Sequence, residues 1–345
     1  MGAYILRRLL LIIPTLLGIM IINFALTQFV PGGPVEQAIA RAEGQGDVFG
    51  GFAGNQGDAG AGGLDQGGPL NEDYIGARGL PPEFIAKLEK EYGFDKPPLE
   101  RFLLMMWNYI RLDFGDSYFR SISVLDLVLE KMPVSITLGL WSTLIAYAIS
   151  IPLGIRKAVK DGSPFDTWTS GAIIFAYATP GFLFGILLLV LFAGGSYWQI
   201  FPLRGLTSDN WDQLSVFGKI ADYAWHITLP VIALSISAFA TLTLLTKNSF
   251  LDEIKKQYVI TARAKGLSER QVTYGHALRN GLIPVVTMLG LQMGQLLAGA
   301  VLVETVFNWP GLGRLAYESI LRRDYPTLLA ILFFSAVIVV VANLL

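Results

Sequence analysis

Six long stretches of the chain contain no charged side chain, and apolar residues dominate each of them. They cover residues 9–35, 132–155, 167–203, 223–246, 280–303 and 325–345, with lengths of 21 to 37 residues. The next-longest uncharged stretch has only ten residues. A helix that crosses the hydrocarbon core of a bilayer needs about 20 apolar residues. The pattern therefore predicts an all-α integral membrane protein with six transmembrane helices.

Two of these stretches allow more than one interpretation. The first follows Arg7 and Arg8, as a signal peptide would, but its apolar run is too long and ends without a small-residue cleavage site. We expect an uncleaved first span. The stretch 167–203 is long enough for two spans, but the Gly-Gly-Ser sequence at 194–196 interrupts it. We expect one helix there, followed by a segment that lies on the membrane surface.

The distribution of Lys and Arg predicts the orientation. With a cytoplasmic N-terminus, the short inner segments hold 12 basic residues in 55 positions, and the short outer loops hold 5 in 53. Cytoplasmic loops carry the excess of basic residues. We therefore expect both termini in the cytoplasm. The domains that follow are residues 1–30 with the first span, a periplasmic loop at 31–133, and a five-helix core at 134–345.

The outer loop 31–133 has two parts. Residues 44–79 contain 13 of the 37 glycines, so we expect this part to be flexible. Beyond it, proline pairs at 81–82 and 97–98 favour the starts of two short helices, the first ending near Tyr92. The second helix has apolar residues at helical spacing from Leu99 to Ile110. That apolar face either packs at the outer rim of the membrane or docks an external partner.

Composition and missing motifs exclude several classes of function. Hydrophobic residues make up 53% of the 345 residues and charged residues 15%, whereas a soluble domain has about 25% charged residues. The net charge of −1 provides no basic field for nucleic acid. The chain has no cysteine, two histidines, no Walker A sequence and no hydrolase motif. We expect no catalytic, cofactor-binding or metal site.

The segment 247–281 is the longest predicted inner loop. It carries seven basic and three acidic residues. Gly266 suits the position that ends a short helix, and Ser268 with Gln271 forms a capping box for the next one. The loop therefore predicts a short helix, a sharp turn and a second helix. The small residues Thr261, Ala262 and Ala264 favour close seating of the first helix in a groove of another protein.

This loop resembles the EAA loop of permease subunits in binding-protein-dependent ABC importers. Residues 261–269 (Thr-Ala-Arg-Ala-Lys-Gly-Leu-Ser-Glu) and 276–280 (His-Ala-Leu-Arg-Asn) resemble the version in peptide permeases. Further motifs of that family occur in the same order, and they lie at Arg7-Arg8 with Pro14, 31–34, 113–117, 133–137, 304–307, 310–313 and 323–326. The glycine-rich outer loop and residues 246–253 resemble the branch that imports oligopeptides and microcin C.

The resemblance implies a type I ABC importer permease fold and a set of partners. It implies a second permease subunit in a heterodimer, two ATPase subunits that bind ATP with Mg²⁺, a periplasmic peptide-binding protein, and a peptide substrate. It places the chain in the bacterial inner membrane as a non-catalytic, multi-pass subunit. The ATPase-coupling residues implied are Thr261, Ala262, Arg263, Ala264, Lys265, Gly266 and Leu267. We expect Arg263 and Lys265 to face acidic groups of the ATPase.

Several points stay open. The EAA loop is named after a glutamate, and the corresponding position in this chain is Ile260. The resemblance therefore implies no salt bridge from this position to the ATPase. A dipeptide or nickel permease remains an alternative substrate class. A self-sufficient carrier or channel would need a titratable group within a span or an inverted repeat, and neither is found. Prolines 152, 180, 230 and 284 can kink helices, and Gln292 and Gln295 are polar residues within a span. The residues that bind substrate are unknown.

Overall fold

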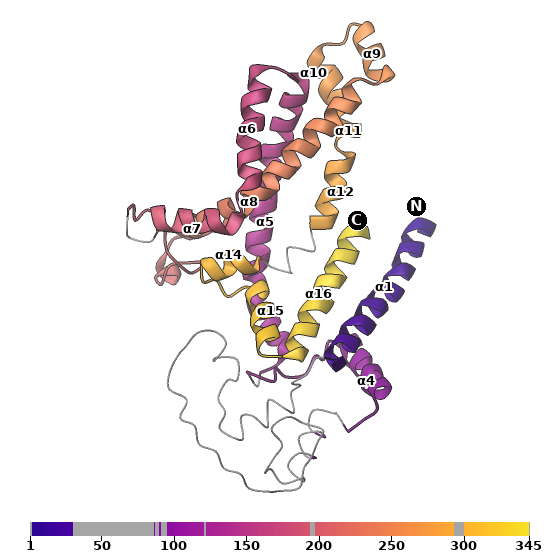
Figure 1. Cartoon of the computed structure of the whole chain (residues 1–345), viewed down its shortest axis with the longest axis vertical. Coiled ribbons are helices and arrows are strands. Elements are labelled where there is room, and N and C mark those ends of the chain that lie inside the picture. Colours follow the sequence, from indigo (N-terminus) through magenta and orange to yellow (C-terminus); the bar gives the residue numbers. More distant parts are fainter. Residues whose placement is uncertain are drawn as a thin grey trace. The chain divides into compact units, whose positions relative to one another are not determined.

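A computed structural model describes residues 2–29, 86, 90, 95–120, 122–193, 197–292 and 300–344 (Figure 1). The described chain is helical and contains no β-strand in these ranges. The longest helices are α1 (Gly2–Phe29), α5 (Val124–Val159), α8 (Val216–Ile254) and α16 (Tyr325–Leu344). The shorter helices are α4 (Pro98–Ile110), α6 (Pro164–Ala178), α7 (Gly181–Phe192), α12 (Ile283–Gln292), α14 (Val301–Val306) and α15 (Leu312–Leu321), with a 3-10 turn η1 (Trp211–Gln213).

Each charge-free stretch coincides with at least one helix, but the number of spans stays a prediction. Within the described residues, one helix, Val124–Val159, is long and apolar enough by itself to cross a bilayer. There are up to three such spans if the bent pairs α6–α7 and the two halves of α8 each count as one. Three shorter apolar helices cover residues 10–25, 283–292 and 325–341. The six-span topology and its orientation are therefore neither confirmed nor contradicted.

The stretch 167–203 differs from its prediction. We expected one helix broken at residues 194–196, which lie outside the described residues. The helix instead ends at Ala178, and α7 starts after Pro180 at an angle of 93° to α6. The residue before a proline is pushed towards an extended backbone, and Thr179 has ψ of 115°. Pro180, one of the prolines expected to kink a helix, thus adds a break within the stretch, and α7 ends at Phe192, shortly before residues 194–196. Pro152 and Pro230 lie inside α5 and α8.

The predicted outer loop, residues 31–133, is described only in part. The predicted second helix is confirmed as α4, which starts with Pro98 at its first position. Its apolar residues Leu99, Leu103, Trp107 and Ile110 are exposed, while Tyr109 on another side is buried. The glycine-rich part 44–79 and most of the predicted helix at 81–92 lie outside the described residues, as does Gln295.

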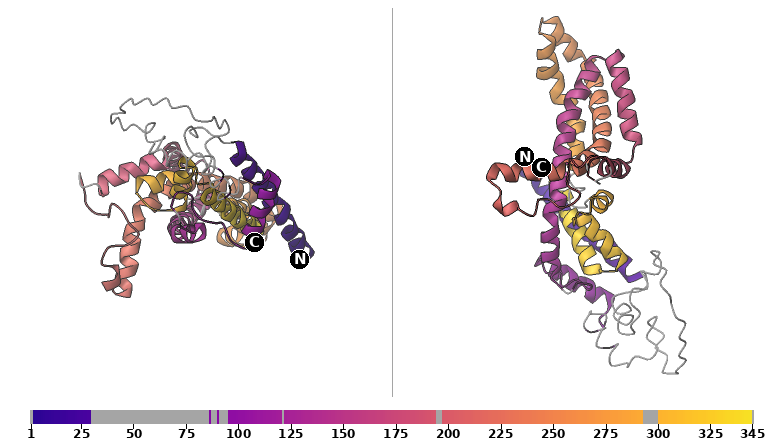
Figure 2. Two further views of the ribbon diagram at one scale, coloured as in Figure 1. Left: turned by 90° about the horizontal axis from the view of Figure 1, so that it is seen from below. Right: turned by 90° about the vertical axis from the view of Figure 1, so that its left-hand side faces the viewer.

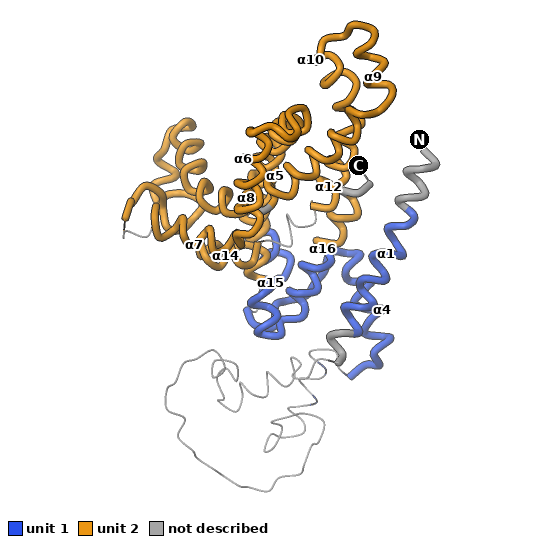
Figure 3. The backbone as a smooth tube through the Cα atoms, turned by 45° about the horizontal axis from the view of Figure 1, so that its top comes forward, with its two compact units in different colours: residues 1–129, 316–333 blue, residues 130–315, 334–345 orange. Residues whose placement is uncertain are grey.

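The chain divides into two compact units (Figure 3). Unit 1 comprises residues 1–129 and 316–333. Its interior includes an aromatic cluster in which Tyr109, Phe114 and Phe333 meet with ring centroids 4.6–5.8 Å apart. Beside it, the buried Asp324 accepts hydrogen bonds from Ser117 Oγ and, at 3.1 Å, from Tyr118 N. Two motifs far apart in the sequence, 113–117 and 323–326, thus meet in unit 1.

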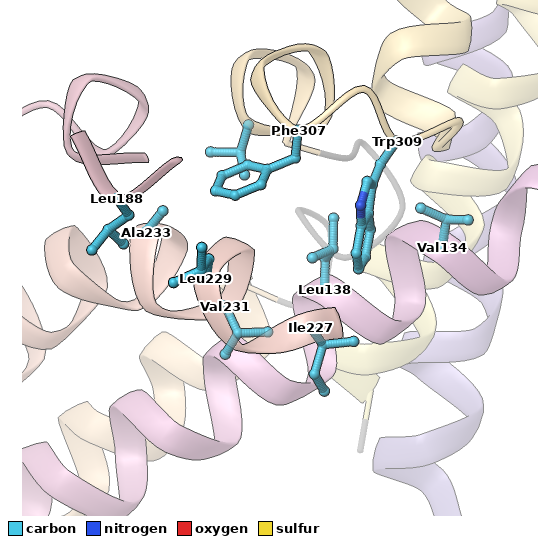
Figure 4. Close-up of a cluster of buried hydrophobic side chains, with 10 residues drawn as sticks. Val134, Leu138, Leu188, Ile227, Leu229, Val231, Ala233, Phe307 and Trp309 are labelled. Carbon is cyan, nitrogen blue, oxygen red and sulfur yellow. The ribbon is translucent and has the colours of Figure 1, made fainter. Parts of the chain in front are cut away.

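Unit 2 comprises residues 130–315 and 334–345. Helix α6 packs along α8, and the right-hand view of Figure 2 shows the two side by side. Buried apolar side chains at the other end of α8 form a second contact region. Phe307 and Trp309 lie there against α5, α7 and α8 (Figure 4). A Cβ atom on Gly185 of α7 would lie 3.1 Å from the Phe307 ring, so this glycine permits the close packing.

Candidate functional site in the predicted inner loop

The segment 247–281 folds as a chain of short helices at the end of α8. They are α9 (Gln257–Ala264), α10 (Glu269–Gln271), the π-helical segment η2 (Val272–Ala277) and α11 (Leu278–Gly281). The predicted helix, sharp turn and second helix are confirmed. The π-helical segment was not predicted, because a wider helical turn has no simple sequence signature. Segments of this kind are frequently found at functional sites.

Gly266 forms the turn after α9. Its φ of +80° is a left-handed conformation that L-residues with a side chain adopt at a cost. The N–H of Gly266 donates to Arg263 O at 2.9 Å, and the N–H of Leu267 donates to Ala262 O at 3.4 Å. These two bonds make a complete Schellman motif, which satisfies the last carbonyls of α9. The predicted helix-ending glycine is therefore confirmed.

Two polar contacts fix the start of α10. Ser268 Oγ accepts from Gln271 N, and Gln271 Oε1 accepts from Ser268 N at 3.0 Å, so the predicted capping box is present. Arg263 also pairs side-on with Glu269, with Nε–Oε1 at 2.9 Å and Nη2–Oε2 at 3.2 Å. We expected Arg263 to face a partner. That contact stays a prediction, because Arg263 is exposed; within the chain its guanidinium pairs with Glu269 in the first turn of α10 and so closes the turn.

A small apolar core holds the loop on the ends of α5 and α8. Phe250 and Val259 are fully buried there. The other buried members of this cluster are Ile155, Ala158, Ala262, Val272 and Ala277. A Cβ on Gly281 would lie 2.8 Å from Phe250 Cδ2, so α11 approaches α8 closely. Packing of this density resists displacement, and α9 is therefore held as a rigid extension of α8.

A polar contact reinforces this attachment. The buried carboxylate of Glu253 accepts a hydrogen bond from Tyr258 Oη and pairs with Lys256 Nζ at 2.6 Å. Asn280 Nδ2 donates to Tyr258 Oη at 3.1 Å, which links α11 to α9. The bonds from Lys256 and Tyr258 hold the pKa of Glu253 below its usual range. Burial and the bond to Glu253 raise the pKa of Tyr258, so both groups keep their donor and acceptor roles at neutral pH.

The predicted site residues divide between the surface and the interior. Thr261, Arg263, Ala264, Lys265 and Gly266 are exposed. Ala262 is 5% exposed and Leu267 is half-buried, so these two anchor the loop to its own core. Ala262 therefore cannot provide the close contact with a partner that we expected from its small size. The helical period places Ala262 on the inner face, together with Val259.

Sequence reasoning missed one member of the exposed face. Ile260 is 47% exposed and lies beside Thr261 and Ala264 at helical spacing. Together with Lys265 at the turn, these residues make a small apolar surface with a basic edge. We call Ile260, Thr261, Ala264 and Lys265 the α9 surface. The sequence feature that could have identified Ile260 is that an apolar residue stands at the position where the family resemblance predicts a glutamate.

The motif at 304–313 forms a second, separate polar centre. Glu304 in α14 is fully buried, and its Oε2 accepts from Arg314 N at 2.7 Å, in the first turn of α15. Its Oε1 accepts from Ser135 Oγ at 2.9 Å and from Ala300 N at 3.3 Å. Burial raises the pKa of Glu304. This carboxyl group caps α15 and ties it to α5 through Ser135.

No group of three or more His, Asp or Glu side chains that could hold a metal ion occurs in the part of the chain that the structure describes. What the loop offers chemically is a rigid, exposed surface at the end of a long helix. Such a surface suits the transmission of movement between proteins, provided that a partner binds it.

Comparisons with known proteins identify the family. Residues 150–345 match the family described as "Binding-protein-dependent transport system inner membrane component". The chain is 60% identical to the peptidoglycan transport system permease protein YejB of Agrobacterium fabrum, and the match covers the whole chain and 95% of that relative. It is 54% identical, over 95% of that relative, to the inner membrane ABC transporter permease protein YejB of Escherichia coli O157:H7. It is also 34% identical to the dipeptide transport system permease protein DppB of Escherichia coli K12, and this match covers 99% of the chain and 94% of that relative. The chain therefore belongs to the inner-membrane components of binding-protein-dependent transport systems, and within them it is similar to ABC permeases for peptides.

Proposed function

We propose that this chain is one of two permease subunits of an ATP-driven importer of peptides. The observation that carries the proposal is the α9 surface, which a Schellman turn, a capping box and a buried core hold rigidly at the end of α8. Peptide substrates are supported by the names of the relatives, which describe permeases for dipeptides, oligopeptides and peptidoglycan. Fragments of peptidoglycan and microcin C-type peptides are the two substrate classes to test first.

The proposal includes a topology and a set of partners. Six spans, with both termini in the cytoplasm, would place residues 247–281 on the inner side and residues 31–133 in the periplasm. The long outer loop and the last outer loop would then face a peptide-binding protein. A second permease subunit would complete the path, and two ATPase subunits would bind ATP with Mg²⁺ and hydrolyse it. The chain itself would carry no catalytic group.

Within this assembly, the α9 surface would sit in a groove of an ATPase subunit. Ile260, Thr261 and Ala264 would make the apolar contact, and Lys265 would face an acidic group at its edge. Gly266 would set the turn, while Ala262 and Leu267 would hold the helix to its own core. When ATP draws the ATPase subunits together, a rigid α9 passes the movement to α8, whereas a flexible loop would absorb it.

The first experiment is purification from the native membrane in mild detergent. We expect a second six-span subunit and ATPase subunits to co-purify, with ATP hydrolysis that rises when a peptide-loaded binding protein is added. Uptake into proteoliposomes should depend on ATP, and competition by peptidoglycan fragments and by microcin C would rank the two substrate classes. A chain that purifies alone and moves solute without ATP would overturn the proposal in favour of a channel or carrier.

A pair of variants at Gly266 tests the coupling role. A Cβ atom at Gly266 would have no heavy atom within 4 Å, so only its φ of +80° opposes substitution. Gly266→Val should distort the turn and separate ATP hydrolysis from uptake, because β-branched residues strongly disfavour this conformation. Gly266→Asn is the matched control, since asparagine tolerates it. Equal uptake per ATP in the two variants would contradict the assignment.

A further inference from the structure

A buried ion-pair network joins three helices close to the inner loop. Lys157, in the last turns of α5, has a side chain with 0% exposure. Its Nζ lies 2.8 Å from Asp166 Oδ1, in the first turn of α6. Asp166 Oδ2 in turn lies 2.7 Å from Lys247 Nζ of α8. One carboxylate therefore links α5, α6 and α8.

The ammonium group of Lys157 binds the start of α6 in several places. Besides the Asp166 carboxylate, it donates to Asp166 O at 2.9 Å, Thr169 Oγ1 at 2.7 Å and Ser170 Oγ at 2.8 Å. All of these acceptors lie in the first two turns of α6. A buried ammonium is tolerated only when it is paired and hydrogen-bonded. Any movement of α6 away from α5 would therefore leave this charge without partners.

The contact between α5 and α8 is close at the same level. A Cβ atom on Gly154 would lie 2.6 Å from Thr246 Cβ and 3.0 Å from Thr243 O, so α8 passes directly over the α5 backbone. Thr246 is the neighbour of Lys247. The ion pair from Lys247 to Asp166 thus starts from a segment of α8 that packing already holds. Charge and packing act together to fix the inner ends of the three helices.

We propose that Asp166 is a positioning residue for transport, which ties the movement of the inner loop to α6. The proposal rests on the proposed function, because it needs an ATPase that moves α9. Lys247 lies just before Phe250 and Glu253, the residues of α8 that anchor α9. A displacement of α9 would therefore pass from Glu253 and Phe250 along α8 to Lys247. The Lys157–Asp166–Lys247 tie carries it to α6, and the bend at Pro180 passes it to α7.

An apolar contact alone would carry such a movement less well. The hydrophobic effect is non-directional, so apolar contacts alone specify less sharply which groups stay paired when helices shift. Separating a buried ion pair leaves an unpaired charge, which is strongly unfavourable. The tie therefore allows the three inner helix ends to move as one body and opposes their separation. Asp161, whose side chain is 46% exposed, also pairs with Lys247 at 2.8 Å, but within the described residues it forms no ion pair with Lys157.

The test uses the complete complex in proteoliposomes, with a radiolabelled tryptic digest as the peptide probe. Asp166→Asn should lower uptake per ATP hydrolysed by about tenfold, while ATP hydrolysis stimulated by the binding protein persists. Asp161→Asn is the matched control, because it removes an exposed carboxylate from the same lysine, and it should change the ratio less than about twofold. Unchanged uptake per ATP in Asp166→Asn would overturn the proposal.

A second variant covers the case in which Asp166→Asn fails to assemble. Lys157→Met combined with Asp166→Asn removes both buried charges, so the complex should assemble again. It should still couple poorly, because the tie is absent. Full coupling in the double variant would show that Asp166 has only a structural role. If the wild-type complex hydrolyses no ATP, the proposed function is wrong and this proposal falls with it, whereas failure of the variants alone overturns only the tie.

The absence of cysteine in the chain allows a direct measurement of the movement. Trp168 in α6 and Tyr274 beside α9 are 82% and 56% exposed, and both can be replaced by labelled cysteines. With the tie intact, the distance between the two labels should stay constant when ATP binds. In the Asp166→Asn background it should change or broaden. A wild-type distance that changes with ATP would contradict movement of α6 with the loop.

Discussion

Two carboxylates of unit 2, Asp166 and Glu304, are both buried at the starts of helices, but their surroundings differ. Asp166 has two lysines as partners, Lys157 and Lys247. Glu304 accepts hydrogen bonds from backbone N–H groups and from Ser135, and it forms no ion pair within the described residues. Burial raises the pKa of both groups, but at Asp166 the hydrogen bonds from the two lysines outweigh burial and hold the pKa well below its usual range. At Glu304 burial has the larger effect, and the pKa of the carboxyl group is raised.

This difference separates two uses of a buried acid. Asp166 is a permanent anion that holds two cations, so it links helices that must move together. Glu304 caps α15 and joins it to α5 with neutral donors, so removing it leaves no unpaired charge. The comparison predicts that mutating the two residues lowers the free energy of unfolding by different amounts. It also predicts that the two losses change in opposite ways with pH.

The largest effect is expected for Asp166→Asn. The substitution leaves the fully buried Lys157 ammonium without its counter-charge, and breaking a buried pair in this way costs roughly 3–5 kcal/mol. The free energy of unfolding, measured by SDS titration in mixed micelles, should fall by that amount. Lys157→Met in the same chain should restore most of the loss. A loss below that of Glu304→Gln would contradict the comparison.

Gly311→Ala should have the next largest effect. A Cβ atom there would lie 2.3–2.5 Å from the carboxyl atoms of Glu304, which several hydrogen bonds hold in place. The carboxyl group would have to leave its donors, and we expect a loss of about 1–3 kcal/mol in the same titration. Gly171→Ala in α6 is the control, because its Cβ would meet no atom within 4 Å. It should be neutral or slightly stabilising.

Glu304→Gln should cost less, about 1–2 kcal/mol, because one amide NH₂ replaces an acceptor oxygen without exposing a charge. Its dependence on pH sharpens the comparison. A raised folded-state pKa means that the wild type loses stability as pH rises above the ordinary value for glutamate, about 4.3. The deficit of the Gln variant should therefore shrink from pH 4 upward.

The deficit of Asp166→Asn should behave in the opposite way. With a lowered folded-state pKa, the contribution of Asp166 is fully present above the ordinary value for aspartate, about 3.9, and is lost only as pH falls below it. Between pH 5 and pH 8 the deficit should stay constant. Unfolding titrations of both variants over the range from pH 4 to pH 8 check the two slopes. Parallel slopes would show that the two carboxyl groups share one protonation behaviour.

The smallest effect is expected at the exposed pair of Arg263 and Glu269. Arg263→Gln should lower the free energy of unfolding by less than about 1 kcal/mol, because solvent weakens an exposed ion pair. The same variant asks whether Arg263 contacts a partner. If it does, association with the ATPase subunits should weaken although the fold is unaffected, and the loss should grow as salt is lowered. Unchanged association would leave Lys265 as the basic contact of the α9 surface.

Features that depend on a few neighbouring residues were predictable from the sequence. Charge-free stretches marked every long helix, since a charged side chain is costly within a bilayer. The turn at Gly266 and the capping box at Ser268 were found because their partners lie within a few positions along the chain. The apolar spacing of α4 was found for the same reason. In the third stretch, α7 ends at Phe192, just before the glycines, whereas Pro180 was only one of four prolines that could kink a helix.

Only the tertiary structure decided which distant groups meet. Lys157 and Lys247 looked like ordinary basic residues at the ends of spans, and nothing near them in the sequence names Asp166 as their shared partner. Glu304 likewise reaches Ser135 across most of the core. The sequence also left open which small residue of α9 faces outward, and packing against Phe250 turned Ala262 inward. A chain can encode its local turns and its membrane segments residue by residue, but a buried charge finds its partner only when helices far apart in sequence pack together.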